Sequence, residues 1–236
     1  MRPANPLYDD PELAEAYARV SAANVCNAAY ERPAVRAVLG DVRGLDVLDA
    51  GAAAGEHSAW LVANGARVVA LDASETMVRL AQRRLGDTAR VIVADLAEPL
   101  PLTDRTSDLV LSSLTLHYVA DWLAPLREFA RVLRPGGRLV LSTHHPSAML
   151  EPDEDYFAVR PVDDAFSDYA AEKVAVRYYH RPLEKIVDDV VAAGFVVRAL
   201  REPRPTAEAE RLDPELAQKL RTRPWFLIVD AETVAR

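Results

Sequence analysis

The segment Val47–Glu56 constrains the fold of this chain more than any other part of the sequence. It starts as a short apolar strand that ends at Asp49, and it continues through Gly51, three alanines and Gly55 toward a helix. Small residues between a strand and a helix let the backbone approach a ligand closely. A second apolar run, Arg67–Asp72, also ends on an acid. The pattern predicts strand–helix units with a ligand site at the strand ends.

Asp49 beside this loop restricts the kind of ligand. A carboxylate would repel phosphates but would tolerate positive charge, which favours a nucleoside cofactor with an amino acid and a sulfonium over a pyrophosphate. The dinucleotide fingerprint needs small residues at the first, third and sixth loop positions. Counted from Gly51, these positions hold Gly51, Ala53 and Glu56. Because Glu56 does not suit close helix–strand packing, the sequence argues against a nicotinamide site.

Composition sets the broad class. A chain of 236 residues with half of them hydrophobic fits a single domain, residues 1–236, with a sizeable core. The net charge of −8, without blocks of like charge, disfavours nucleic acid as a partner. No apolar run reaches membrane-spanning length, the N-terminus lacks a signal-peptide core, and the single Cys26 cannot form an internal disulfide. We therefore expect a cytoplasmic protein, a monomer or homodimer, with a small-molecule partner and no membrane partner.

Hydrophobic periodicity predicts an α/β fold. Residues 9–39 read as one or two helices, and after them strands and helices alternate, which is typical of a parallel sheet covered by helices on both faces. Residues 1–40 are predicted to form an N-terminal helical cap, and residues 146–180, rich in Asp, Pro and aromatics, an inserted lid. The predicted strands are 46–50, 67–71, 90–94, 108–113, 138–143, 195–201 and 225–230, and the predicted helices are 55–64, 75–85, 122–133 and 183–193.

Five motifs in order carry a family resemblance: Leu48–Gly55, Leu71–Ser74, Ala94–Leu96, Ser107–Tyr118 and Leu133–Arg138. Together they resemble the class I S-adenosylmethionine-dependent methyltransferases of the small-molecule type. The resemblance implies a seven-stranded, mostly parallel Rossmann-like sheet with an antiparallel last strand, and S-adenosylmethionine as the cofactor. The sequence departs from the family's loop at one glycine, which is Ala53 here, and its methyl leaves less room beside the cofactor.

The resemblance also assigns cofactor contacts. Asp49, Asp72 and Asp95 recur every 23 residues, each at the end of a predicted strand. Asp72 would hold the two ribose hydroxyls, because a carboxylate accepts two hydrogen bonds at once, Asp95 would accept from the adenine amine, and Asp49 would face the methionine end. The predicted cofactor-binding set is Asp49, Ala50, Gly51, Gly55, Asp72, Ala73, Met77, Asp95, Leu96, Ser112, Ser113, Leu114 and His117. Helix capping is the alternative for an acid or serine at such a turn when each residue is taken alone, and Met77 reads equally well as a core residue.

A histidine is the natural candidate for a general base, because its pKa lies near neutrality. Of the five histidines, four follow the predicted fourth strand. His117, His144 and His145 are the predicted catalytic residues, and a structural role at a strand end is the alternative for each. Histidines scattered over two loops, with no acid evident behind them, do not make a zinc site. No metal is predicted.

The acceptor pocket is predicted between the N-terminal helices, His117, the His144–His145 turn and the insertion. The aromatic residues concentrate in these covering segments, which favours a small, partly apolar acceptor. A satellite core under the insertion explains the same pattern equally well. The predicted substrate-binding residues are Tyr8, Tyr17, Tyr118, His144, His145, Tyr178 and His180.

The activity that these features predict is transfer of a methyl group to oxygen, nitrogen or carbon, with the acceptor left open. Small-molecule and secondary metabolism is the expected setting. Two alternatives stay open: a module that binds S-adenosylmethionine or S-adenosylhomocysteine without transfer, and an enzyme that uses the bound cofactor for a non-methylating rearrangement.

Overall fold

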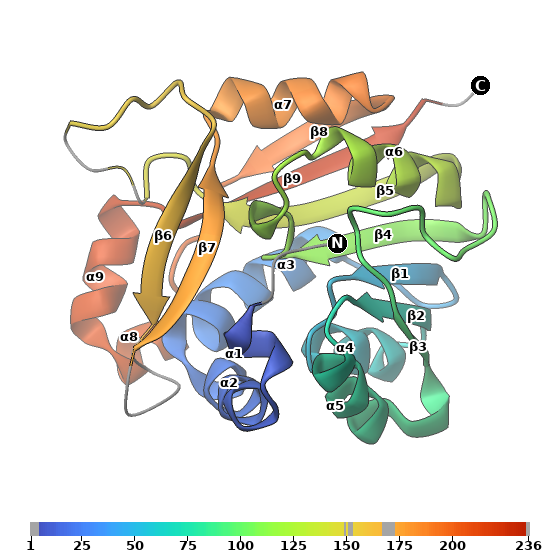
Figure 1. Cartoon of the computed structure of the whole chain (residues 1–236), viewed down its shortest axis with the longest axis horizontal. Helices are drawn as coiled ribbons and strands as arrows, with labels where there is room; N and C mark the ends of the chain where they lie inside the picture. Colours follow the sequence, from blue (N-terminus) through green and yellow to red (C-terminus); the bar gives the residue numbers. More distant parts are fainter. Residues whose placement is uncertain (1–4, 149, 151–152, 167–172, 235–236) are drawn as a thin grey trace.

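The computed structural model describes residues 5–148, 150, 153–166 and 173–234. Its centre is a seven-stranded sheet in the order β3-β2-β1-β4-β5-β9-β8 (Figure 1). Neighbouring strands are parallel except that β9 runs antiparallel to both β5 and β8. The strands are β1 (Asp46–Ala50), β2 (Arg67–Asp72), β3 (Arg90–Val93), β4 (Ser107–Ser113), β5 (Leu133–His144), β8 (Phe195–Arg201) and β9 (Phe226–Thr233). The predicted seven-stranded α/β fold, including its antiparallel last strand, is confirmed.

Helices cover both faces of the sheet, and their apolar residues divide the core into two layers. Val35 of α3 and Leu61 of α4 pack with Val47 and Leu109 on one face. Leu126 and Phe129 of α6 and Ile186 and Val190 of α7 pack on the other. The bounds are α3 (Arg32–Leu39), α4 (Glu56–Ala63), α5 (Glu75–Leu85), α6 (Leu123–Val132) and α7 (Leu183–Ala192).

The N-terminal segment forms a chain of helices beside the carboxyl ends of the strands. It consists of α1 (Pro6–Asp9), α2 (Pro11–Ala23) and a π-helical turn (Asn27–Glu31) that leads directly into α3. Asp10 caps α2, since its side chain accepts from the backbone N–H groups of Glu12 and Leu13, and Pro11 occupies the first helical position. This agrees with the predicted helical character of the segment, whose role as a cap stays a prediction.

The predicted insertion contains a β-hairpin that the sequence analysis did not anticipate. Its strands are β6 (Arg160–Phe166) and β7 (Val174–His180), which pair antiparallel in a separate two-stranded sheet. β7 contacts α1 and the 3-10 turn Leu116–Tyr118, and Val174 and Val176 pack against Leu7. The remainder of 146–180 lies partly outside the described residues, so the lid prediction is assessed only on this hairpin.

Two further differences have local causes. The segment between β8 and β9 forms α8 (Ala207–Leu212) and α9 (Pro214–Thr222), each capped by its preceding residue, Thr206 or Asp213. These capping residues are visible in the sequence, but no helix was predicted in this segment. β5 begins at Leu133, five residues before the predicted start, because the turn through Gly136 is included with a register shift against β4. No helix of the described residues is long and apolar enough to span a bilayer.

Candidate functional site

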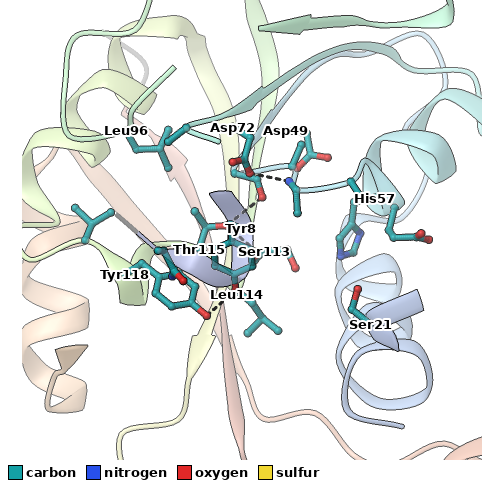
Figure 2. Close-up of a pocket in the computed structure, with 18 of the residues that line it drawn as sticks. Tyr8, Ser21, Asp49, His57, Asp72, Leu96, Ser113, Leu114, Thr115 and Tyr118 are labelled. Carbon is teal, nitrogen blue, oxygen red and sulfur yellow. Dashed lines mark hydrogen bonds between the residues drawn. The ribbon is translucent and has the colours of Figure 1, made fainter. Parts of the chain in front are cut away.

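A cavity of about 320 Å³ lies at the carboxyl ends of β1, β2, β3 and β4, beside the N-terminal helices (Figure 2). This is the edge at which ligands bind in open α/β sheets. Side chains from the predicted cofactor edge and from the N-terminal helices line the same space. The cavity therefore joins two parts of the chain that the sequence analysis assigned to cofactor and acceptor.

The loop after β1 adopts a backbone that requires glycine at Gly51. This residue has φ 84°, and a Cβ built on it would lie 2.2 Å from the Thr115 side chain. The N–H groups of Gly51 and Ala52 both donate to the carbonyl of Leu71 at 2.8 Å. The close packing of the loop against Thr115 and β2 fixes one wall of the cavity.

Ala53 is the unusual residue of this loop. It has φ 47°, in the left-handed region that costs a non-glycine residue about 1–2 kcal/mol. Its N–H donates to Oδ2 of Asp72 at 2.9 Å (Figure 2). Oδ1 of the same carboxylate accepts from the Ser74 N–H, also at 2.9 Å. Asp72 is thereby held in one orientation beside the cavity.

Asp49 is almost completely buried, with 1% exposure, and still lines the cavity. The Ser58 hydroxyl donates to it at 2.6 Å. Burial raises the pKa of this carboxyl, while the charge of His57 and the bonds from Ser58 oppose the rise. A positively charged ligand group beside Asp49 would favour its ionised form.

The structure brings most of the predicted cofactor and tyrosine residues to one cavity. Those on its wall are Asp49, Gly51, Asp72, Ala73, Asp95, Leu96, Ser113, Leu114, Tyr8, Tyr17 and Tyr118. The equal spacing of the three acids thus corresponds to three strand ends on one edge, as expected.

Five predicted cofactor residues lie off the wall: Ala50, Gly55, Met77, Ser112 and His117. Ala50 and Ser112 are fully buried, and the Ser112 hydroxyl donates to the Ala50 carbonyl. Met77 is fully buried against Ala14 and Ala54, so it is a core residue in this structure. Gly55 is the N-cap of α4, and a Cβ on it would lie 3.3 Å from Ala81, so its small size serves packing of α4 on α5.

The predicted histidines gather elsewhere, behind the cavity. The rings of His117 and His144 stack with centroids 4.0 Å apart, and Tyr178 meets His144 edge-on at 4.7 Å. Burial lowers the pKa of His144 to about 4, and burial with the charges of His144 and Arg181 lowers that of His117 well below its usual value. Neither ring lines the cavity. A role as general base stays a prediction, and this geometry does not favour it.

The two other histidines of the predicted site bond to neighbouring segments of the chain. His145 is 3.2 Å from Glu202 and bonds to the Ser147 hydroxyl, and His180 bonds to the Tyr156 carbonyl at 2.8 Å. Together with His144 and Tyr178 they line a second, water-sized cavity of about 20 Å³. The structure therefore separates His144, His145, Tyr178 and His180 from the tyrosines predicted to share their pocket.

One end of the main cavity is aromatic. The hydroxyls of Tyr8 and Tyr118 are 2.7 Å apart, and the Tyr8 and Tyr17 rings meet edge-on with centroids 5.0 Å apart (Figure 2). The Ser74 hydroxyl donates to the Tyr8 carbonyl at 2.6 Å. These bonds hold α1 against the body of the protein and give the cavity a partly apolar, hydroxyl-bearing wall.

The part of the cavity at Glu31 and Arg32 carries charge that the sequence analysis missed. Oε1 of the buried Glu31 accepts from the hydroxyls of Ser113 at 2.8 Å and Ser142 at 2.5 Å, and its Oε2 lies 3.6 Å from Nε2 of His57. Burial alone would raise the pKa of Glu31, but His57 and the two serines outweigh it and leave the pKa lowered. Arg32 also lines this part of the cavity. No sequence pattern marks charges in a helical segment as buried, so only the fold reveals them.

Among the described residues, no group of three or more His, Cys, Asp or Glu side chains is arranged to hold a metal ion.

Comparisons with known proteins agree with this geometry. Residues 48–141 match the family model of the methyltransferase domain. The chain is 33% identical to the crystal structure of an S-adenosylmethionine-dependent methyltransferase from Mesorhizobium loti, with a TM-score of 0.73 over 86% of this chain and 97% of that one.

Curated relatives match over a shorter span. A demethylmenaquinone methyltransferase of Clavibacter sepedonicus is 40% identical over 133 residues, 55% of this chain and 54% of the relative. A malonyl-[acyl-carrier protein] O-methyltransferase of Pseudescherichia vulneris is 34% identical over 156 residues, 65% of this chain and 61% of the relative. The matches thus span little more than half the length of these two relatives.

Proposed function

The chain belongs to the S-adenosylmethionine-dependent methyltransferases, and from that membership we propose that it transfers the cofactor's methyl group to a small, partly apolar acceptor. One observation carries the proposal: the acid-lined strand ends and the tyrosine-lined end belong to a single cavity. A cofactor and an acceptor bound in one cavity can react directly, without either dissociating from the protein.

The chain's residues fit the cofactor's nucleoside half. The carboxylate of Asp72 is oriented by the N–H groups of Ala53 and Ser74 and faces the cavity, so it can accept from two ribose hydroxyls. Asp95 and Leu96 follow β3, the next strand along the edge, and would border the adenine. Gly51 lines the cavity and packs closely against Thr115, where a Cβ would collide.

When bound, S-adenosylmethionine supplies a methyl group on a positively charged sulfur, which a nucleophile can take in one displacement. The protein's contribution is then to align the acceptor and exclude water. Tyr8, Tyr17 and Tyr118 offer apolar faces with hydroxyl groups, which suits orientation of a small acceptor. Since the predicted histidine bases lie off the cavity wall, we propose that the rate enhancement comes mainly from alignment of the acceptor with the cofactor.

The named acceptors of the relatives support a small-molecule substrate. One relative is named for demethylmenaquinone and another for a malonyl group on a carrier protein. Because these acceptors differ chemically, neither is assigned to this chain, and transfer to oxygen, nitrogen or carbon stays open.

The proposal is tested by binding and by transfer. Calorimetry should show that the folded protein binds S-adenosylhomocysteine. Incubation with methyl-labelled S-adenosylmethionine and a panel of phenols, carboxylic acids and amines should then label at least one class. A folded protein that does not bind the cofactor product contradicts the proposal, whereas binding without transfer to any acceptor would favour a cofactor-binding module.

A further inference from the structure

Arg32 is a buried cation on the cavity wall. It is the first residue of α3 and is only 8% exposed. Its guanidinium forms no hydrogen bond or ion pair with any residue in the described part of the chain; the nearby Glu31 and Tyr17 influence it through charge alone. A buried charge without a bonded partner costs several kcal/mol. A ligand anion would remove that cost.

His57 lines the same cavity as Arg32 and lies 3.6 Å from Glu31, the residue that precedes Arg32. It stands in the first turn of α4 and is 7% exposed. Its Nε2 faces Oε2 of Glu31 at 3.6 Å, while its Nδ1 is buried without a hydrogen-bond partner in the described structure. Figure 2 shows the imidazole below Asp49, close to the cavity. A second buried polar atom in this part of the cavity therefore lacks a partner.

The surrounding charges do not supply the missing anion. Glu31 is occupied by Ser113, Ser142 and His57, and Glu56 is paired with Arg84. The charge of Arg32 lowers the pKa of both Arg36 and Arg84, in each case after the larger effect of burial. Arg32 thus has the cations Arg36 and Arg84 as well as Glu31 around it, and an anion placed there would relieve repulsion as well as desolvation.

We propose that Arg32 and His57 form a carboxylate-binding corner of the cavity, with Glu31 holding the imidazole in place. A guanidinium matches a carboxylate with two parallel hydrogen bonds, which suits Arg32 to this ligand. The inference rests on the proposed function, since it concerns a ligand of the same cavity. The carboxylate has two sources: the amino-acid end of the cofactor, or an acceptor that itself carries a carboxylate.

Calorimetry with three probes separates these sources. S-adenosylhomocysteine carries the amino-acid end, 5′-methylthioadenosine has the same nucleoside without it, and malonate, added to protein saturated with S-adenosylhomocysteine, represents a carboxylate acceptor. The variants are Arg32→Met and His57→Asn, with Arg127→Met on the exposed side of α6 as the matched control.

If the corner binds the cofactor, Arg32→Met should lower the affinity for S-adenosylhomocysteine by roughly tenfold to hundredfold. The affinity for 5′-methylthioadenosine should stay within about twofold of the wild-type value. His57→Asn should show the same split with a smaller loss. If the corner binds the acceptor, Arg32→Met should spare both nucleosides and abolish malonate binding. Arg127→Met should change none of the three affinities.

Two results would overturn the proposal. If Arg32→Met lowers the affinity for both nucleosides equally, Arg32 only supports the fold. If the affinity for none of the three probes changes, no carboxylate binds there. None of the measurements requires turnover. A protein that shows the Arg32-dependent split but transfers no methyl group keeps this inference and loses the proposed function.

Discussion

The backbone N–H of Ala53 donates a 2.9 Å hydrogen bond to the carboxylate of Asp72. This bond joins the loop after β1 to the end of β2, and it holds Ala53 at φ 47°. Asp72, which is proposed to bind the ribose hydroxyls, therefore also stabilises the left-handed conformation of Ala53 in the loop after β1. Changes at either position should affect the other.

Removal of the Asp72 side chain should weaken cofactor binding strongly. Asp72→Ala deletes a fixed carboxylate and leaves the Ala53 N–H without its acceptor, and hydrogen bonds to a charged group contribute about 1.5–3 kcal/mol. We expect the affinity for S-adenosylhomocysteine to fall about tenfold to a hundredfold by calorimetry. Asp72→Asn keeps an oxygen for one of the two N–H groups and should lose less. Unchanged affinity in Asp72→Ala would remove Asp72 from the site.

Ala53→Gly should retain cofactor binding. Glycine adopts the left-handed conformation without the cost of about 1–2 kcal/mol that Ala53 bears, although it also gains entropy in the unfolded chain. Thermal unfolding should show equal or slightly higher stability, and affinity should be equal or better. Ala52→Gly, at a neighbouring residue without positive φ, should be less stable by about 0.5–1 kcal/mol. Loss of binding in folded Ala53→Gly would show that the loop is misassigned.

Gly51→Ala should be much more damaging than an alanine at another left-handed glycine. Gly86 has φ 51° and no atom within 4 Å of a built Cβ, so Gly86→Ala measures backbone strain alone, about 1–2 kcal/mol. At Gly51 the new methyl also meets Thr115 at 2.2 Å, which should add about 1–3 kcal/mol. Denaturant unfolding of the two variants gives the difference. Equal losses would mean that Thr115 moves away freely.

The buried His117–His144 stack should make stability depend on pH. The pKa of His144 is about 4 in the folded protein and about 6.5 when unfolded, so the unfolded state binds more protons between these values. Its contribution is present above pH 6.5 and is lost as the pH falls toward 4. Between pH 7 and pH 5 the loss from His144 should be about 2 kcal/mol.

His144→Phe keeps a flat ring in the stack but removes the titrating group. The measured quantity is the difference in unfolding free energy between pH 7 and pH 5, so a uniform loss of stability in the variant does not alter the result. The wild-type difference should shrink in His144→Phe. If both proteins show the same pH dependence, the stacked pair does not control acid stability.

The sequence predicted features that depend on local periodicity. The parallel α/β sheet and the position of Asp49, Asp72 and Asp95 on one edge follow from repeated strand–helix units, whereas the antiparallel last strand was expected from the family resemblance. The histidine predictions assumed that side chains at the carboxyl end of a strand face the substrate. A strand end fixes where a residue lies along the edge but not which way its side chain turns. His117 is buried, and His144 lines the small second cavity instead of the main one.

The charged part of the cavity was beyond sequence reasoning for a related reason. Glu31 and Arg32 lie in a helical segment, where charged residues usually face solvent. Both are buried, and the Glu31 carboxylate accepts hydrogen bonds from Ser113 and Ser142, more than 80 residues away in sequence. Long-range packing of this kind has no local signature, in contrast to the loop around Gly51.

The place of β9 in the sheet has a consequence for the order of folding. Strands β1 to β5 pair with one another as the chain proceeds, but β9 follows every other strand and lies between β5 and β8. β8 therefore has no strand to pair with until β9 is in place. Until then one edge of β5, whose residues are mostly buried in the folded protein, stays unpaired. Such edges promote association between chains. We expect the transition state for completing the sheet to involve these distant segments, which makes folding slow relative to formation of the first five strands.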